Sequence, residues 1–211
     1  MNTGGLILAA GLSSRMGGFK PLLPINETPL ITLCVEGMLR AGVSCVVVVL
    51  GCHAAKVEAV LQPYVQTGSV RFAYNRDYAT TDMLASIKKG LAALPSCDAF
   101  YLLPGDMPAV AQSTYAVLRR EIERTNASVV FPSVDGRRKH PPLIASTGIP
   151  NILAYTGDFG LRGVWEQLSC AMVEVADTGC TLDADTTEDY ERLKRYLENK
   201  RSGVAPEEQV V

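Results

Sequence analysis

Residues 43–51 read VSCVVVVLG, and this run decides the fold class. Its valines are β-branched, and they follow one another without the polar alternation that a strand with one wet face would show. Such a continuous apolar run is typical of a strand that is buried on both faces of a parallel sheet. We therefore expect an α/β protein in which helices cover both sides of this strand.

Strand-like and helix-like segments alternate along the rest of the chain. The expected strands are residues 4–10, 43–51, 70–75, 98–106, 127–132, 141–146 and 171–176. The expected helices cover residues 29–42, 53–61, 83–94 and 111–124, one or two segments up to residue 168, and residues 187–199. This order predicts a Rossmann-like, doubly wound and mostly parallel sheet with helices on both faces. We expect residues 1–199 to form one domain and residues 200–211 to be a flexible C-terminal tail, either a true terminus or the start of a linker.

The composition excludes several classes of protein. Hydrophobic residues make up 47% and charged residues 20% of the 211 residues, as in a folded globular chain. The formal net charge of −2 gives no electrostatic reason to expect a nucleic acid or a membrane surface as partner. No apolar run is long enough to span a bilayer, and the first residues lack the basic start of a signal peptide. The six cysteines show no C-x-x-C pair, so zinc is not indicated and reduced thiols in a cytoplasmic protein are expected.

The first expected strand leads into a loop with the sequence AAGLSSRMGGFKP, residues 9–21. The spacing fits neither a Walker A loop nor a G-x-G-x-x-G dinucleotide loop. Small residues at 9, 10 and 11 let a ligand approach the backbone closely, and Ser13 or Ser14 can cap a short helical turn. Arg15 and Lys20 add two positive charges for an anion. The residues favour a triphosphate-binding loop, and an ordinary strand–helix turn with solvated basic residues is the alternative.

Residues 8–20, LAAGLSSRMGGFK, resemble the signature L-A-A-G-x-S-x-R-M-G-x-x-K of the MobA-like nucleotidyltransferases, and within them most closely the molybdenum cofactor cytidylyltransferases. The resemblance extends from about residue 5 to residue 197 and implies a nucleotide-diphospho-sugar transferase-like fold. It implies Arg15, Lys20 and Asp106 as catalytic residues. It further implies nucleotide binding by Leu8, Ala9, Ala10, Gly11, Ser13, Arg15, Lys20, Asn75, Ser86, Pro104 and Gly105.

Carboxylates follow two of the expected strands. Asp106 ends the stretch YLLPGD, where it is either a turn aspartate or a ligand that holds Mg²⁺ against phosphates. The stretch TLDADTTEDY places further acids before the last helix, which Thr186 or Thr187 can cap. Helix capping and the helix dipole account for the acids at 188 and 189 but not for Asp183 and Asp185. The resemblance implies Mg²⁺ as cofactor, with Asp106 as one ligand and Asp183, or alternatively Asp185, as another.

Two further stretches resemble the elements that line the acceptor side of the family's pocket. One contains His140 and Pro141, where a lone histidine can equally be structural. The other is GDFGLRG, from which Gly157, Asp158, Gly160 and Arg162 are predicted to bind the acceptor. As an alternative, Arg162 is a surface residue paired with Glu166 at helical spacing.

Three positions depart from the family pattern. Asn75, Tyr78, Met83 and Ser86 match the family's N-x-x-[YW]-x-x-G-M-x-x-S, but Asp82 stands where glycine is usual. Lys139 replaces the glycine before the histidine, and Thr187 replaces a proline. The departure at Asp82 puts a charged side chain where a nucleotide or an acceptor normally comes close. It bears on the identity of these ligands more than on the type of reaction.

The resemblance implies transfer of a nucleotidyl group from a nucleoside triphosphate to a phosphate-bearing acceptor, with release of pyrophosphate. Ala10 resembles the cytidylyl branch, since the guanylyl branch tends to carry glycine there. The resemblance therefore favours transfer of CMP from CTP, with GMP from GTP as the alternative, to a molybdopterin-type acceptor. It implies a molybdoenzyme or its maturation chaperone as a further partner. Two alternatives remain. One is a sugar- or polyol-phosphate cytidylyltransferase of the same fold, and the other is a maturation partner that binds NTP without turning it over.

Overall fold

The computed structural model describes residues 1–12 and 18–201. The main strands are β1 (Thr3–Ala9), β4 (Val46–Leu50), β5 (Val70–Tyr74), β6 (Ala99–Pro104), β7 (Val129–Val134), β8 (Arg137–Arg138), β9 (Leu143–Ala145) and β10 (Cys170–Glu174). The α-helices are α1 (Leu30–Arg40), α2 (Ala54–Gln66), α3 (Met83–Ala93), α4 (Gln112–Thr125), α5 (Ile149–Ala154), α6 (Gly160–Trp165) and α7 (Thr187–Arg201). A small hairpin, β2 (Pro24–Ile25) with β3 (Thr28–Pro29), and the short 3-10 segments η1 (Lys20–Leu22), η2 (Ser146–Gly148) and η3 (Thr178–Thr181) complete the elements.

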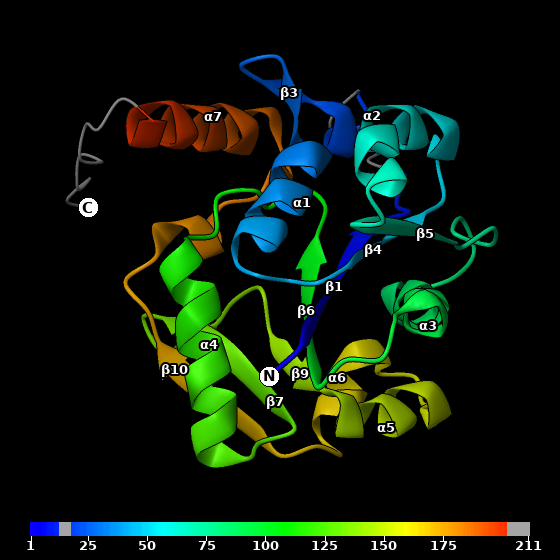
Figure 1. The fold of residues 1–211 in the computed structure, drawn as a ribbon, viewed down its shortest axis with the longest axis vertical. Helices are drawn as coiled ribbons and strands as arrows, with labels where there is room; N and C mark the ends of the chain where they lie inside the picture. Colours follow the sequence, from blue (N-terminus) through cyan, green and yellow to red (C-terminus); the bar gives the residue numbers. More distant parts are fainter. Residues whose placement is uncertain (13–17, 202–211) are drawn as a thin grey trace.

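The main sheet is mostly parallel, which confirms the predicted fold class. Its strand order is β10-β7-β9-β6-β1-β4-β5, with β8 added to β7. Strand β1 lies in the middle, pairing in parallel with β4 on one side and β6 on the other. The strand that decides the fold, β4, is buried along its whole length. Figure 1 shows α1, α2 and α4 on one side of this sheet and α3, α5 and α6 on the other.

The hydrophobic core has two layers, because successive side chains of a strand point to opposite faces. Ile7, Val46 and Val48 face the layer that α1, α2 and α4 cover. Leu6 and Val47 face the opposite layer, beneath α3, α5 and α6. Each fully buried valine or leucine of this kind contributes about 1.5–3 kcal/mol to the free energy of folding relative to an exposed one. The unbroken apolar run at residues 46–50 thus reflects burial on both faces.

One strand, β9, runs antiparallel to its neighbours β6 and β7. The sequence pattern predicts this strand but not its direction. The tight turn at Asp135 and Gly136 first returns the chain as β8, antiparallel to β7. The connection from β7 to β9 is then too short for the helical crossover that a parallel strand would need, which takes about a dozen residues or more.

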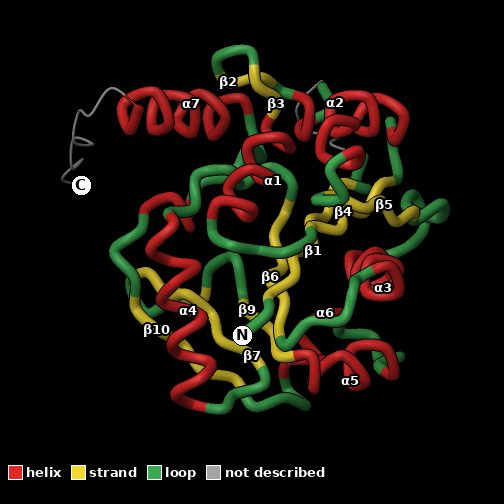
Figure 2. Tube along the Cα trace, in the orientation of Figure 1, coloured by secondary structure: helices red, strands yellow, loops and turns green. Residues whose placement is uncertain are grey.

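A third apolar cluster attaches the last helix to the small hairpin β2–β3. Ile25, Leu30 and Leu33 pack there against Leu193 of α7. Figure 2 shows α7 lying beside this hairpin at the end of the sheet where β1 and β6 point. Of the two threonines that could cap α7, Thr186 does so. Its hydroxyl accepts a hydrogen bond from the backbone N–H of Asp189, and the Asp189 carboxylate accepts one from the backbone N–H of Thr186.

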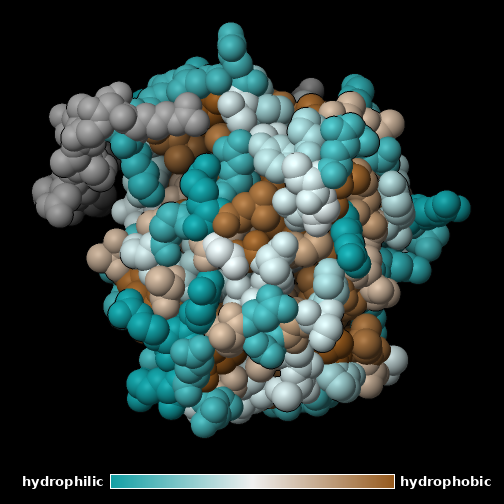
Figure 3. All heavy atoms as spheres, viewed as in Figure 1, coloured by the Kyte–Doolittle hydropathy of each residue, from teal (hydrophilic) through white to brown (hydrophobic). Residues whose placement is uncertain are grey.

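The described residues contain no helix with both the length and the apolar character that a membrane crossing requires. On the face shown in Figure 3, hydrophobic side chains emerge in separate small areas between polar ones. This mixed pattern is ordinary for a folded protein surface.

Helix α3 lies close to the sheet because it carries glycine at position 90. A Cβ added to Gly90 would lie 2.3 Å from Cδ1 of Leu6 and 2.7 Å from Cγ2 of Val49. In contrast, a Cβ added to Gly37 of α1 would meet nothing within 4 Å.

We therefore expect the same substitution to act in opposite directions at these two helical glycines. Gly90→Ala should lower the free energy of unfolding by about 1–2 kcal/mol, since overpacking outweighs the gain in helix propensity. Gly37→Ala should raise it by up to about 1 kcal/mol through helix propensity alone. Urea unfolding of both variants and the wild type measures the two effects, and equal changes would contradict the close packing at Gly90.

Candidate active site

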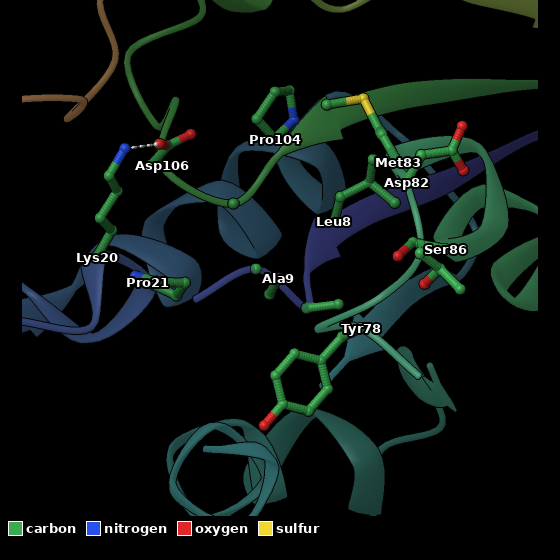
Figure 4. A pocket seen from close by; sticks show the side chains of 14 residues that line it. Leu8, Ala9, Lys20, Pro21, Tyr78, Asp82, Met83, Ser86, Pro104 and Asp106 are labelled. Atoms are coloured by element: carbon green, nitrogen blue, oxygen red, sulfur yellow. Dashed lines mark hydrogen bonds and ion pairs between the residues drawn. The ribbon is translucent and has the colours of Figure 1, made fainter. Parts of the chain in front are cut away.

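A pocket opens where β1 and β6 end. The two strands pair through Leu8 and Pro104, and the N–H of Gly105 donates to the carbonyl of Leu8 over 2.9 Å, so both chains leave the sheet side by side. The pocket has a volume of about 300 Å³. Figure 4 shows it from close by, and its lining consists of Leu8, Ala9, Ala10, Gly11, Lys20, Pro21, Tyr78, Thr81, Asp82, Met83, Ser86, Pro104, Gly105 and Asp106. Ligands of open α/β sheets bind at this end of the strands.

The Lys20 side chain joins two carboxylates at one end of the pocket. Its Nζ lies 3.5 Å from Oδ2 of Asp106 and 2.5 Å from Oδ1 of Asp185. Figure 4 shows the contact between Lys20 and Asp106. The Lys20 and Asp106 side chains are only 12% and 17% exposed, so solvent screens their attraction poorly. Residues from the first loop, from the end of β6 and from the segment before α7 thus meet at this point.

The stretch Leu182–Asp185 places two carboxylates on the pocket side by simple alternation. Leu182 and Ala184 are buried in the third apolar cluster. In an extended segment the intervening side chains point the opposite way, so Asp183 and Asp185 face away from that cluster. Oδ1 of Asp183 accepts a hydrogen bond of 3.2 Å from the backbone N–H of Asp185. The sequence left the choice between these two aspartates open, and the structure brings both of them near Asp106.

A buried carboxylate, Asp177, holds this acidic segment in place. It is 5% exposed and accepts hydrogen bonds from the N–H groups of Ala111 and Gly179 and from the Thr114 hydroxyl, over 2.8, 3.0 and 2.7 Å. Ala111 and Thr114 belong to the start of α4, where backbone N–H groups lack partners within the helix. Asp177 therefore fastens the chain between β10 and α7 to the N-terminus of α4.

The carboxylates near Lys20 have the donor chemistry of a magnesium site. Burial raises the pKa of the Asp106 carboxyl, the Lys20 ammonium lowers it, and the charges of Asp183 and Asp185 raise it again. Among the described residues, the Lys20 ammonium thus contacts Asp106 and Asp185, and Asp183 lies near enough to affect the pKa of Asp106. Within residues 1–12 and 18–201, no group of three His, Cys, Asp or Glu residues is placed to hold a metal alone. Carboxylate oxygens are ligands that Mg²⁺ prefers, and proteins commonly hold this ion by one or two carboxylates together with water and phosphates.

Asn75 lies beneath the pocket and does not line it. The side chain is 1% exposed, and its amide donates to Oγ1 of Thr81 over 3.0 Å and to Oγ of Ser86 over 2.9 Å. Both acceptors line the pocket. The structure therefore gives Asn75 contact with two lining hydroxyls, while the predicted nucleotide-binding residue Ser86 lies on the wall itself.

The residues predicted to bind the acceptor lie in two different parts of the site. His140 lies beside β6, near Leu102 and Asp183. Its Nδ1 is buried and has no hydrogen-bond partner among the described residues. Pro141 is also buried. Gly157, Asp158 and Arg162 are exposed on the loop and helix next to α3, and Arg162 forms no ion pair with Glu166, which the structure also describes. Gly160 faces Asp82, at the edge of the pocket.

The other predicted residues divide into three groups. Leu8, Ala9, Ala10, Gly11, Lys20, Ser86, Pro104, Gly105 and Asp106 line the pocket. The roles predicted for Ser13 and Arg15 fall on residues outside those that the structure describes. Pro21, Tyr78, Thr81, Asp82 and Met83 line the pocket without a role assigned from the sequence. Tyr78, Asp82 and Met83 belong to the Asn75–Ser86 motif, and this motif is the sequence signal that could have identified them as lining residues.

Solved structures share this arrangement of helices and strands. A nucleotidyl transferase from Methanothermobacter superposes with a TM-score of 0.76 at 24% identity, over 94% of this chain and 99% of the other. Rv0371c from Mycobacterium tuberculosis, crystallised with manganese, superposes with a TM-score of 0.67 at 25% identity, over 92% and 99% of the two chains. The fold is therefore that of the nucleotidyltransferases, and a relative has been crystallised with a divalent metal.

The sequence profile of the MobA-like NTP transferase domain matches residues 5–172, and the chain belongs to this family. The molybdenum cofactor cytidylyltransferase of Escherichia coli is 27% identical over 194 residues, which cover 92% of this chain and 96% of that protein. The predicted family resemblance is thereby confirmed, and the family is one of NTP-dependent nucleotidyltransferases.

The environment of His140 leads to a test by pH. Burial lowers the pKa of His140, while a hydrogen bond with the Leu102 backbone and the charge of Asp183 raise it by less. As the pH falls below about 6.5, the unfolded chain gains a proton at this residue before the folded one does, so stability is lost. We expect His140→Gln to show a smaller fall in Tm than the wild type between pH 7 and pH 5. A parallel fall in both proteins would contradict a neutral, buried imidazole.

Proposed function

We propose that this chain transfers CMP from CTP to a phosphate group of molybdopterin, or of its molybdenum-loaded form, and releases pyrophosphate. The observation that carries this proposal is the ion-paired group of Lys20, Asp106 and Asp185, which lies where β1 and β6 end. It is supported by the family and by the cytidylyltransferase among the curated relatives. The remaining proposed partners are a molybdoenzyme or its maturation chaperone, which would receive the product.

The reaction forms one P–O bond and breaks another. A phosphate oxygen of the acceptor attacks the α-phosphorus of CTP, and the bond from that phosphorus to the bridging oxygen of pyrophosphate breaks in line. The protein lowers the barrier by positioning the two reactants and by stabilising charge on the phosphate oxygens. Lys20 stabilises the departing pyrophosphate, together with Arg15, whose role rests on the sequence alone. The small residues Ala9, Ala10 and Gly11 leave room for the nucleotide beside the backbone.

Asp106 and Asp183, with Asp185 as the alternative to Asp183, are the residues proposed to hold Mg²⁺. An ion held there would supply positive charge that offsets the repulsion among the phosphate groups and these carboxylates. The Lys20 ammonium stabilises the same carboxylates by direct contact. Ser86 offers its hydroxyl to the nucleotide from the opposite wall.

We expect Asp106→Asn to lower kcat by about a hundredfold or more, because it removes the charge that holds the cation near the phosphates. The variant should keep its fold, since the charged form of this carboxyl is disfavoured by burial. Pyrophosphate release from CTP with molybdopterin as acceptor measures the reaction. Thermal shifts with CTP, GTP, ATP and UTP, each with and without Mg²⁺, measure binding, and the magnesium-dependent shift with CTP should vanish in the variant.

The matched control is Asp135→Asn, which neutralises an exposed aspartate in the turn between β7 and β8 and should leave both readings unchanged. Full activity in Asp106→Asn would exclude the assigned metal role. Nucleotide binding by the wild type without any pyrophosphate release, across a panel of phosphate acceptors, would replace the transferase by a non-catalytic NTP-binding partner. Turnover only with a sugar or polyol phosphate would replace the proposed acceptor.

The choice of base is tested at Ala10, which is 5% exposed and lines the pocket. A methyl group at this wall restricts the room for a purine, so Ala10→Gly should shift the ratio of kcat/KM for CTP over GTP toward GTP by roughly tenfold. Steady-state kinetics with both nucleotides give the ratio. An unchanged ratio would remove the basis for preferring CTP.

A further inference from the structure

Asp82, where the family usually has glycine, has a fixed carboxylate at the edge of the pocket. Its Oδ1 accepts a hydrogen bond of 2.9 Å from the N–H of Ala85 and so caps α3. Its Oδ2 points toward Gly160 and lies 3.4 Å from the position that a Cβ atom on that glycine would occupy. Among residues 1–12 and 18–201, no lysine, arginine or histidine lies within ion-pair distance of Asp82. The carboxylate therefore has lone pairs to offer to a ligand.

Two large exposed apolar side chains belong to the segments that meet at this carboxylate, one from the residue after Asp82 and one from the residue before Gly160. Met83 is 53% exposed, and Figure 4 shows its side chain extending over the pocket toward Pro104. Phe159, which precedes Gly160, is 74% exposed. Exposed apolar groups beside a polar anchor at the rim of a pocket are typical of a ligand-binding surface.

The loop that carries Phe159 is fastened to the helix that carries Asp82. The Lys88 ammonium of α3 donates a hydrogen bond of 2.6 Å to the carbonyl of Tyr155. The Tyr155 ring fills the space over Gly163, where a Cβ would lie 1.9 Å from its hydroxyl oxygen. Helices α3 and α6 are also in contact. The backbone that carries Phe159 is consequently held against the helix that Asp82 caps.

This combination selects a ligand by its chemistry. An ionised carboxylate only accepts hydrogen bonds, so it favours a ring edge with N–H donors and repels carbonyl oxygens and phosphates. An aromatic face and a thioether favour a flat ring that stacks on them. We propose that Asp82, Met83 and Phe159 form a subsite for the heterocycle of the acceptor, a planar ring that presents an amino group beside a ring N–H. The acceptor phosphate then points to the Lys20 end of the pocket.

The inference rests on the proposed function, because that function supplies a pterin-bearing acceptor, but its test needs no turnover. The probes are pterin, which carries a 2-amino group, and lumazine, which carries a carbonyl oxygen at the same position. Both fluoresce, so binding to the full chain is followed by the change in their emission.

We expect the wild type to bind pterin about tenfold more tightly than lumazine, since hydrogen bonds to a charged group are strong and the carbonyl is repelled. Asp82→Asn keeps the helix cap and should bring the two affinities to within about twofold of each other. Phe159→Ala should weaken both probes by roughly fivefold through lost stacking. The control Asp135→Asn should match the wild type.

Several results would overturn the subsite. They are equal binding of the two probes by the wild type, binding of neither, or an unchanged preference in Asp82→Asn. A loss of preference for CTP over UTP in Asp82→Asn, with the pterin preference intact, would place the carboxylate against the nucleotide base and would equally overturn the proposal. Probe discrimination without pyrophosphate release would refute the transferase while leaving the subsite standing, so the two failures are distinguishable.

Discussion

The contact of the Lys20 ammonium with Asp106 and Asp185 is the interaction around which the site is organised. It joins three segments that are far apart in the chain, and it satisfies carboxylates that would be costly to bury without a positive partner. Among the described residues, the charges of Asp183 and Asp185 nevertheless raise the pKa of the Asp106 carboxyl, so these carboxylates repel one another. A cation and an anionic ligand that arrive together can both be accommodated there, since each neutralises the charge that the other meets.

Two simple structural devices bring these charges together. The parallel pairing of β1 with β6 lets the first loop and the Asp106 turn leave the sheet at the same level. The buried Asp177 attaches the segment after β10 to the start of α4, and alternation along Leu182–Asp185 then turns its two acids away from the apolar cluster. The first device includes the pocket-lining pair Leu8 and Pro104, whereas Asp177 does not line the pocket. The arrangement of the site therefore depends largely on the backbone pairing of two strands and on the buried carboxylate of Asp177.

The sequence predicted the fold class, the order of elements and most of the pocket lining, because these follow from periodic burial and from a long family signature. The direction of β9 was not predicted, since three apolar residues form a strand in either direction, although the Asp135–Gly136 pair is a local hairpin signal that points to the reversal of the chain. The sequence also could not tell that Asn75 lies below the wall and that Ser86 lies on it, because both are polar residues of one motif. Asp177 carried no signal at all, as its partners come from a helix more than sixty residues away.

The antiparallel strand β9 has a consequence for how the domain comes apart. Within the described residues, β9 is the only strand that is hydrogen-bonded both to the group β6, β1, β4 and β5 and to the group β7 and β10. A three-residue seam of this kind is where partial opening takes the least free energy, so the sheet divides naturally into two cooperative units. Strands β1 and β6, which lead into the pocket, belong to one unit, and β10, which leads into the acidic segment, belongs to the other. Opening along this seam would separate β7 and β10 from the strands that lead into the pocket, and amide hydrogen exchange at Leu143–Ala145 would report it.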